Sequence, residues 1–139
     1  MSLPLFADSG YWIALTSGSD ALHNRALSLG AIVRGRPIIT TELVLTEYLD
    51  GSANWGEYRR SAAAKFVRGL EQSGAVHVVP MSHELFDAAL TLYDARPDKE
   101  WSLTDCASIL VCERESITEV LAHDQHFIQA GLTALLRED

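Results

Sequence analysis

The sequence contains few cysteines and no long apolar run. Its two cysteines, Cys106 and Cys112, are six positions apart in a segment that reads as one helix, so their side chains point to opposite sides and cannot easily form a disulfide. No apolar run approaches the roughly 18 residues of a membrane-spanning helix, and the first residues lack the basic flank and longer apolar stretch of a signal peptide. We therefore expect a cytoplasmic protein with reduced thiols and no membrane partner.

Positive charge is also scarce. Eleven Lys and Arg residues against nineteen Asp and Glu residues give a formal net charge of −8. Tight, sequence-independent binding to long nucleic acid depends on cations that neutralise phosphates, so this class of protein is disfavoured. A nucleic-acid substrate would need bound metal ions or a local basic patch, although charged helix faces are more often simply solvated. The candidate phosphate contacts are Arg59, Arg60, Lys65, Arg68, Arg96 and Lys99.

Hydrophobic residues, by contrast, make up 47% of the 139 positions, which is enough for a core without disulfide or zinc support. We expect one domain that spans residues 1–139. Short apolar segments alternate with segments of helical periodicity, a pattern typical of parallel strands joined by helical crossovers. The sequence thus predicts an α/β fold, a three-layer α/β/α sandwich with a central, mostly parallel sheet of four to five short strands.

The expected elements follow from apolar spacing and from Gly, Pro and capping residues. Strands are expected within residues 3–7, 37–39, 75–79, 119–122 and, less clearly, 132–136. Helices are expected within residues 11–15, 20–29, 41–50, 55–73, from 82 through about 93, 102–115 and 124–129.

Two acidic residues, Asp8 and Asp124, come just after apolar strands at the start of a turn into a helix. Ligands of open parallel sheets bind beyond the carboxyl ends of the strands, so these positions are natural candidates for a site. Aspartate is also among the best residues for capping a helix N-terminus. Taken singly, each residue is equally well explained as a cap.

Two further acids, Glu47 and Asp105, lie early in their expected helices. Glu47 is flanked by Leu43 and Val44 on one side of its helix, so the carboxylate lies beside apolar surface and favours a cationic partner, unless that side is a solvated edge. Asp105 opens an otherwise apolar helix, but Ser102 three positions earlier forms the pattern of a capping box. Taken alone, neither residue distinguishes a role in a binding site from a structural or solvated role.

Together, the four acids predict a metal site. Three strand–helix units place Asp8, Asp105 and Asp124 at one edge of the sheet, and Glu47 follows one turn into its helix. Carboxylates crowded together repel one another and raise each other's pKa unless cations balance them. Hard cations such as Mg²⁺ and Mn²⁺ prefer oxygen ligands, so the residues by themselves indicate an acidic divalent-metal site.

Four blocks of sequence also resemble the PIN-domain family, in particular its VapC-type toxins. The blocks are spread along nearly the whole chain in the family's order and with its separations. They are residues 6–15 (FADSGYWIAL), 37–49 (PIITTELVLTEYL), 101–108 (WSLTDCAS) and 118–127 (TEVLAHDQHF), followed by Ala130-Gly131.

The resemblance implies a metal-dependent endoribonuclease. In it, Asp8, Glu47, Asp105 and Asp124 would be the catalytic and metal-binding acids, with Mg²⁺ or Mn²⁺ as the cofactor that activates water for attack on an RNA phosphodiester. Ser9 and Thr104 match small hydroxyl positions that would orient these carboxylates. The resemblance further implies a homodimer and a small antitoxin protein whose tail occupies the active-site groove.

Several alternatives stay open at this stage. The chain could be a PIN nuclease that processes cellular RNA without an antitoxin, or a PIN-like binding module without activity. His123 and His126 flank Asp124, but no other pair with ligand spacing supports a zinc site. The aromatic residues Trp55 and Tyr58, together with Trp12, could face a partner or belong to the core and its rim.

Overall fold

Five short, mostly apolar strands form one parallel sheet in the computed structural model, which describes residues 2–137. The strands are β1 (Leu5–Ala7), β2 (Ile38–Thr41), β3 (Val76–Val79), β4 (Glu119–Leu121) and β5 (Thr133–Ala134). Their order in the sheet is β3-β2-β1-β4-β5, and every neighbouring pair is parallel.

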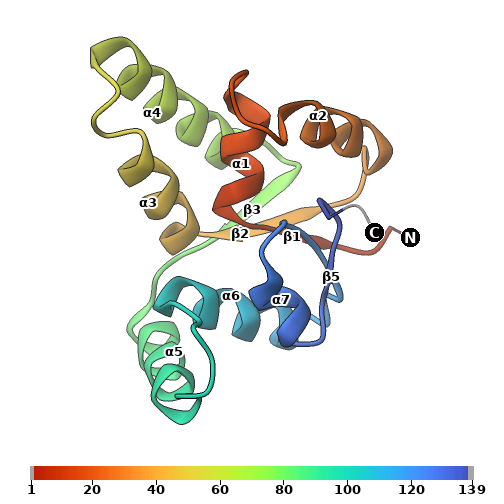
Figure 1. Ribbon diagram of the computed structural model, residues 1–139, viewed down its shortest axis with the longest axis vertical. Helices are drawn as coiled ribbons and strands as arrows, with labels where there is room; N and C mark the ends of the chain where they lie inside the picture. The colour runs from red at the N-terminus through yellow and green to blue at the C-terminus, as the bar shows by residue number, and fades with distance from the viewer. Residues whose placement is uncertain (1, 138–139) are drawn as a thin grey trace.

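Helices cover both faces of this sheet (Figure 1). One layer holds α1 (Ser9–Thr16), α2 (His23–Ile32), α3 (Glu42–Gly51) and α4 (Glu57–Gln72), and the other holds α5 (His83–Ala95), α6 (Leu103–Arg114) and α7 (Gln125–Gln129). Crossovers between parallel strands are right-handed, so the helices change face when the chain turns back from β3 to β4. The predicted three-layer α/β/α sandwich is confirmed.

The core lies between the sheet and these two helical layers. All of β1 is buried, and α6 is buried along most of its length because its side chains are largely apolar. Cys106 and Cys112 are both buried and both free, as their spacing on one helix predicts. Residues 2–137 contain no helix that is long and apolar enough to cross a membrane.

Two local expectations need correction or completion. The second helix runs from His23 to Ile32 rather than over residues 20–29, and Gly30 lies inside it instead of ending it. A side chain at position 30 would have its Cβ 3.3 Å from the Tyr11 hydroxyl, so the glycine allows α2 to pack closely on α1. Of the aromatic residues, Trp12 belongs to the core, whereas Trp55 and Tyr58 are exposed.

Candidate active site

The order of the strands creates a crevice between β1 and β4. The chain builds the sheet outward from β1 to β3 and then returns to place β4 on the other side of β1. Ligands of open α/β sheets bind outside the carboxyl ends of the strands at such a switch point. Asp8 follows β1 and donates its backbone N–H to Leu121 at the end of β4, while Asp124 follows β4 itself.

A pocket of about 460 Å³ opens at this crevice. All four acids predicted from the sequence line it, although they come from four separate parts of the chain. Its walls are Asp8, Ser9, Gly10, Glu47, Glu100, Ser102, Asp105, His123, Asp124 and His126. The described residues that line the pocket therefore include five carboxylates and no Lys or Arg.

Asp8 is the most buried of the four acids, with only 8% of its surface exposed. It occupies the N-cap position of α1, yet its side chain makes no capping hydrogen bond. Its Oδ1 atom is buried without a hydrogen-bond partner among residues 2–137. A buried carboxylate oxygen without a partner is unfavourable, and helix capping does not account for it, so this oxygen is available to bind a cation.

The environment of Asp8 also changes its acidity. Its pKa is raised from 3.8 to about 7, first because the carboxyl is buried. A hydrogen bond from the Ser9 backbone opposes this shift, and the negative charges of Glu47, Asp105 and Asp124 add to it. The crowding of acids predicted from the sequence is thus felt most strongly at Asp8.

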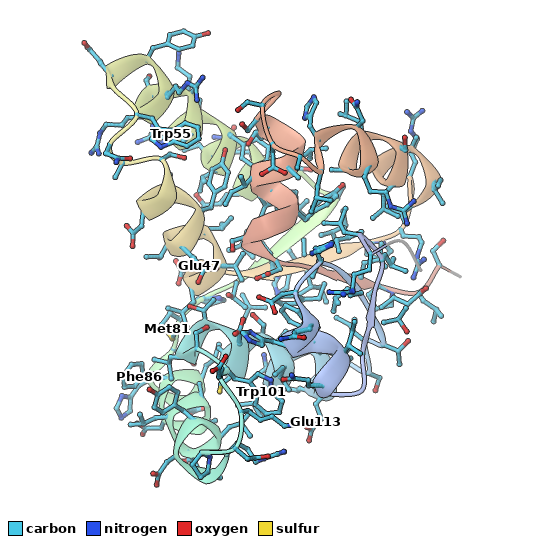
Figure 2. All side chains as sticks on the ribbon, viewed as in Figure 1. Glu47, Trp55, Met81, Phe86, Trp101 and Glu113 are labelled. Atoms are coloured by element: carbon cyan, nitrogen blue, oxygen red, sulfur yellow. The ribbon has the colours of Figure 1, made fainter. Side chains whose placement is uncertain are left out.

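Glu47 is exposed on α3, so the solvated-edge alternative describes its surroundings better than burial against apolar surface. Its position is nevertheless constrained, because the Ser9 hydroxyl donates a hydrogen bond to Glu47 Oε1. Figure 2 shows Glu47 on α3 near the boundary between the two helical layers. Trp55 lies farther from that boundary, in the segment that joins α3 to α4. Ser9 is buried and therefore orients Glu47 from within the fold.

The capping role that the sequence offered for Asp105 is observed, and metal binding by the same side chain stays a prediction. Ser102 and Asp105 form a capping box at the start of α6, with the Ser102 backbone N–H donating to Asp105 Oδ2 at 3.0 Å. The same side chain lines the pocket. Thr104 does not line it, and its carbonyl accepts a hydrogen bond from Ser108, so an orienting role for the Thr104 hydroxyl stays a prediction.

Asp124 is a helix cap as well as a wall of the pocket. Its Oδ1 accepts the backbone N–H of His126 at 2.9 Å, which caps α7, and its side chain is 46% exposed. The imidazole of His126 also lies 2.9 Å from Asp105 and 3.2 Å from Asp124. The sequence pattern pointed to His126 only in connection with zinc. The sole signal for its contact with Asp105 was the position of His126 two residues after Asp124.

The basic residues proposed as phosphate contacts do not enter the pocket. Arg59 stacks over the Trp55 ring with its guanidinium carbon 4.7 Å from the centroid, and Arg60 donates to a backbone carbonyl. Arg96 forms a two-pronged ion pair with Asp98. Lys99 is close to Asp98, and Lys65 and Arg68 are exposed on α4. Their contact with RNA stays a prediction.

The donor set of the pocket fits a hard divalent cation. Within residues 2–137 no group of three or more His, Cys, Asp and Glu side chains is already close enough together to hold a metal ion. Magnesium, however, usually binds one or two carboxylates and completes its shell with water and substrate oxygens. The unpartnered Oδ1 of Asp8, beside three other carboxylates, is an oxygen ligand of the required kind.

Comparison with known proteins gives the fold a family. The PIN-domain model matches residues 5–132 of the chain. Among solved structures, the chain is similar to the Mycobacterium tuberculosis VapC20 toxin, which is described as cleaving the sarcin-ricin loop. The TM-score is 0.81 with 26% sequence identity, and the match covers 93% of this chain and 96% of VapC20.

The chain also has the fold of FitAcB from Neisseria gonorrhoeae, with a TM-score of 0.67, 14% identity and coverage of 94% and 95% of the two chains. No curated protein matches the chain in sequence. The family match spans nearly the whole chain and includes each strand-end acid identified above. The chain belongs to the PIN-domain family.

Proposed function

We propose that this protein is a metal-dependent endoribonuclease and the toxin of a type II toxin–antitoxin pair, with its active site in the acidic pocket. The observation that carries the proposal is Asp8, a buried carboxylate with an unpartnered oxygen that faces three other acids. Membership of the PIN-domain family and similarity to VapC20, a toxin that cleaves RNA, support the reaction class.

In this proposal Asp8, Glu47, Asp105 and Asp124 hold Mg²⁺ or Mn²⁺. The bound cation would supply Lewis-acid activation of water and charge neutralisation at the phosphodiester. Asp8 contributes the oxygen with no other partner, and the Ser9 hydroxyl holds Glu47 toward the same pocket. Burial keeps bulk water away from Asp8, which strengthens its attraction for a cation.

The RNA strand would enter a pocket that has no cation of its own among the described lining residues. A polyanion approaching five carboxylates is repelled, so binding of the scissile phosphate depends on prior loading with the divalent cation. This dependence predicts that RNA affinity itself, and not only the rate of cleavage, requires metal.

A test of the activity uses purified protein with single-stranded RNAs and structured hairpins, including a sarcin-ricin loop hairpin as one substrate. Cleavage is expected with Mg²⁺ or Mn²⁺ and should stop in excess EDTA, then resume when Mn²⁺ is restored. Products that persist in EDTA would contradict the metal mechanism. Binding of RNA without any cleavage, across the panel and both metals, would instead favour the non-catalytic module.

We also propose a small antitoxin protein, which the toxin relatives support, and a homodimer. A cationic side chain of the antitoxin would compete with metal for the acidic pocket. Expression of the chain should arrest growth of a host cell, and co-expression of the product of an adjacent small gene should relieve the arrest. Cleavage without growth arrest, and with no inhibitory partner, would favour a PIN nuclease that processes cellular RNA.

A further inference from the structure

The imidazole of His126 lies between two of the four acids, which belong to different elements. Its Nδ1 atom is 2.9 Å from Oδ2 of Asp105, at the start of α6, and 3.2 Å from Oδ1 of Asp124, which caps α7. His126 itself is the second residue of α7, and its side chain is only 20% exposed. The ring thus links two carboxylates that approach the pocket from separate helices.

The chemistry of these contacts fixes where the ring carries hydrogen. An ionised carboxylate can only accept a hydrogen bond, so Nδ1 carries the hydrogen that is donated to Asp105, and the same N–H lies within ion-pair distance of Asp124. Both the neutral Nδ1–H tautomer and the imidazolium have this hydrogen, and the contact therefore does not depend on the charge of His126. The other ring nitrogen, Nε2, takes no part in the link.

The same two carboxylate oxygens have second donors as well. Asp105 Oδ2 accepts from the backbone N–H of Ser102, and Asp124 Oδ1 accepts from the backbone N–H of His126. Asp105 is therefore held through one oxygen by two donors, and Asp124 through one oxygen by a backbone donor with the imidazole beside it, while the other oxygen of each acid takes no part in these contacts. An arrangement of this kind presents one oxygen of each acid in a fixed direction.

We propose that His126 is a positioning residue that clamps Asp105 and Asp124 through its Nδ1–H, so that their remaining oxygens face a shared divalent cation. The inference rests on the proposed metal-dependent function of the pocket. Without the clamp, the half-exposed Asp124 carboxylate would keep only its backbone hydrogen bond and would turn more readily toward solvent, away from the negative charge of Asp105. Loss of an outer-shell partner of this type weakens metal binding by about 10- to 100-fold.

Three substitutions distinguish the clamp from other roles of the same ring. His126→Asn places an amide N–H close to the position of Nδ1, whereas His126→Gln places one close to Nε2, and His126→Ala removes both. His83→Ala on the distant helix α5 serves as the matched control, because His83 is exposed and lies outside the pocket. The first readout is Mn²⁺ affinity, measured from the electron paramagnetic resonance signal of free Mn²⁺, and the second is kcat and KM for RNA cleavage.

The clamp predicts that His126→Asn keeps Mn²⁺ affinity within about threefold of the parent, while the Gln and Ala variants lose about tenfold or more. Saturating Mn²⁺ should then restore much of their cleavage. A parent that binds Mn²⁺ and a His126→Ala variant that binds it equally well would overturn the clamp alone. A Gln variant that outperforms the Asn variant would also overturn it, since Nε2 would then be the working atom.

Failure of the proposed function gives a different result. A parent that neither binds Mn²⁺ nor cleaves RNA would remove the function and the clamp together. A parent that binds Mn²⁺ without cleaving RNA would remove the function, and the Asn, Gln and Ala affinities would still decide the clamp. Melting temperatures in EDTA, measured for every variant, confirm that each compared protein is folded.

Discussion

Two hollows share the helices α1 and α3 but differ in chemistry. The acidic pocket lies at the start of α1 and encloses about 460 Å³, whereas a second hollow, the aromatic groove, encloses about 550 Å³ farther along the same helices and against α4. The walls of the aromatic groove include Ile13, Thr16, Tyr48, Trp55, Tyr58 and Phe66. By size and apolar lining alone, the groove would be the natural ligand site.

The two hollows differ in whether their polar side chains have hydrogen-bond partners. In the aromatic groove, the Tyr48 hydroxyl is hydrogen-bonded to Thr16 at 3.0 Å, and Tyr48 packs against Phe66 with a centroid distance of 5.5 Å. In the acidic pocket, Asp8 has a buried oxygen with no partner among the described residues. An unsatisfied buried group therefore identifies chemistry that volume and hydrophobicity overlook.

The largest expected contrast is in catalysis. Asp8→Asn should slow RNA cleavage by about 1000-fold, because a metal ligand supports several kcal/mol of transition-state stabilisation. Trp55→Ala in the aromatic groove should change cleavage of a short RNA by only about twofold, as for most surface substitutions. Single-turnover rates measure both. Comparable losses in the two variants would show that the hollows act as one site.

The next contrast concerns pH without metal. The pKa of Asp8 is about 7 in the folded protein and 3.8 in the unfolded chain, so the folded state binds more protons between these values. The free energy of unfolding should therefore fall as pH rises from about 4 to 7, by at most about 4 kcal/mol. Urea unfolding in EDTA measures this change. The decrease in the free energy of unfolding with rising pH should disappear in Asp8→Asn and persist in Trp55→Ala. A parallel pH profile in the parent and Asp8→Asn would argue against burial of a titrating Asp8.

Metal binding should counteract the destabilisation that the ionised Asp8 carboxylate causes. Mn²⁺ at about 100 times its Kd stabilises a protein by about 2.7 kcal/mol, equivalent to roughly 10 °C in Tm for a chain of this size. The Trp55→Ala variant should show the full Mn²⁺ shift, and Asp8→Asn little of it. At pH 8 the Asp8→Asn protein should melt above the parent in EDTA, and Mn²⁺ should narrow or reverse this difference. Equal Mn²⁺ shifts in the two proteins would separate Asp8 from the metal.

The smallest expected effect separates capping from metal binding at the start of α6. Ser102→Ala removes the cap and should cost about 1 kcal/mol in EDTA, while most of the Mn²⁺ shift is kept. Asp105→Asn retains an acceptor for the Ser102 N–H and removes one like charge, so it should change stability in EDTA less and lose the Mn²⁺ shift. Equal Mn²⁺ shifts in the Ser102→Ala and Asp105→Asn variants would mean that Asp105 acts only as a helix cap.

The parallel sheet could be predicted because its signals are local. The runs that became β1 and β4 are short and largely apolar, and an Asp and a helix follow β1 directly and β4 after Ala122 and His123. Both the strand and the edge of the site were therefore visible in the sequence. The second helix was predicted to stop before Gly30, but this glycine lies inside α2, where it allows close packing on Tyr11. The role of Gly30 depends on a tertiary contact, and the periodicity of the sequence does not reveal such contacts.

The roles of individual side chains were harder to predict for the same reason. The sequence presented capping and metal binding at Asp105 as alternatives, but one carboxylate has two oxygens and can take part in both. Glu47 is exposed although apolar neighbours precede it on the helix, because Leu43 and Val44 pack inward while the acid points to the pocket edge. The contact of His126 with Asp105 joins residues 21 positions apart and depends on how α6 meets α7.

The buried cysteines of α6 have a consequence for the response to oxidative stress. Cys112 is fully buried, and its pKa is raised to about 12 by burial and by the charge of Asp8, while burial and Asp105 also raise the pKa of Cys106. Oxidants attack the thiolate, which is nearly absent from both residues at neutral pH. Although both thiols belong to the helix that carries Asp105, peroxide should leave these two thiols unmodified in the folded protein, so its activity should not depend on thiol oxidation.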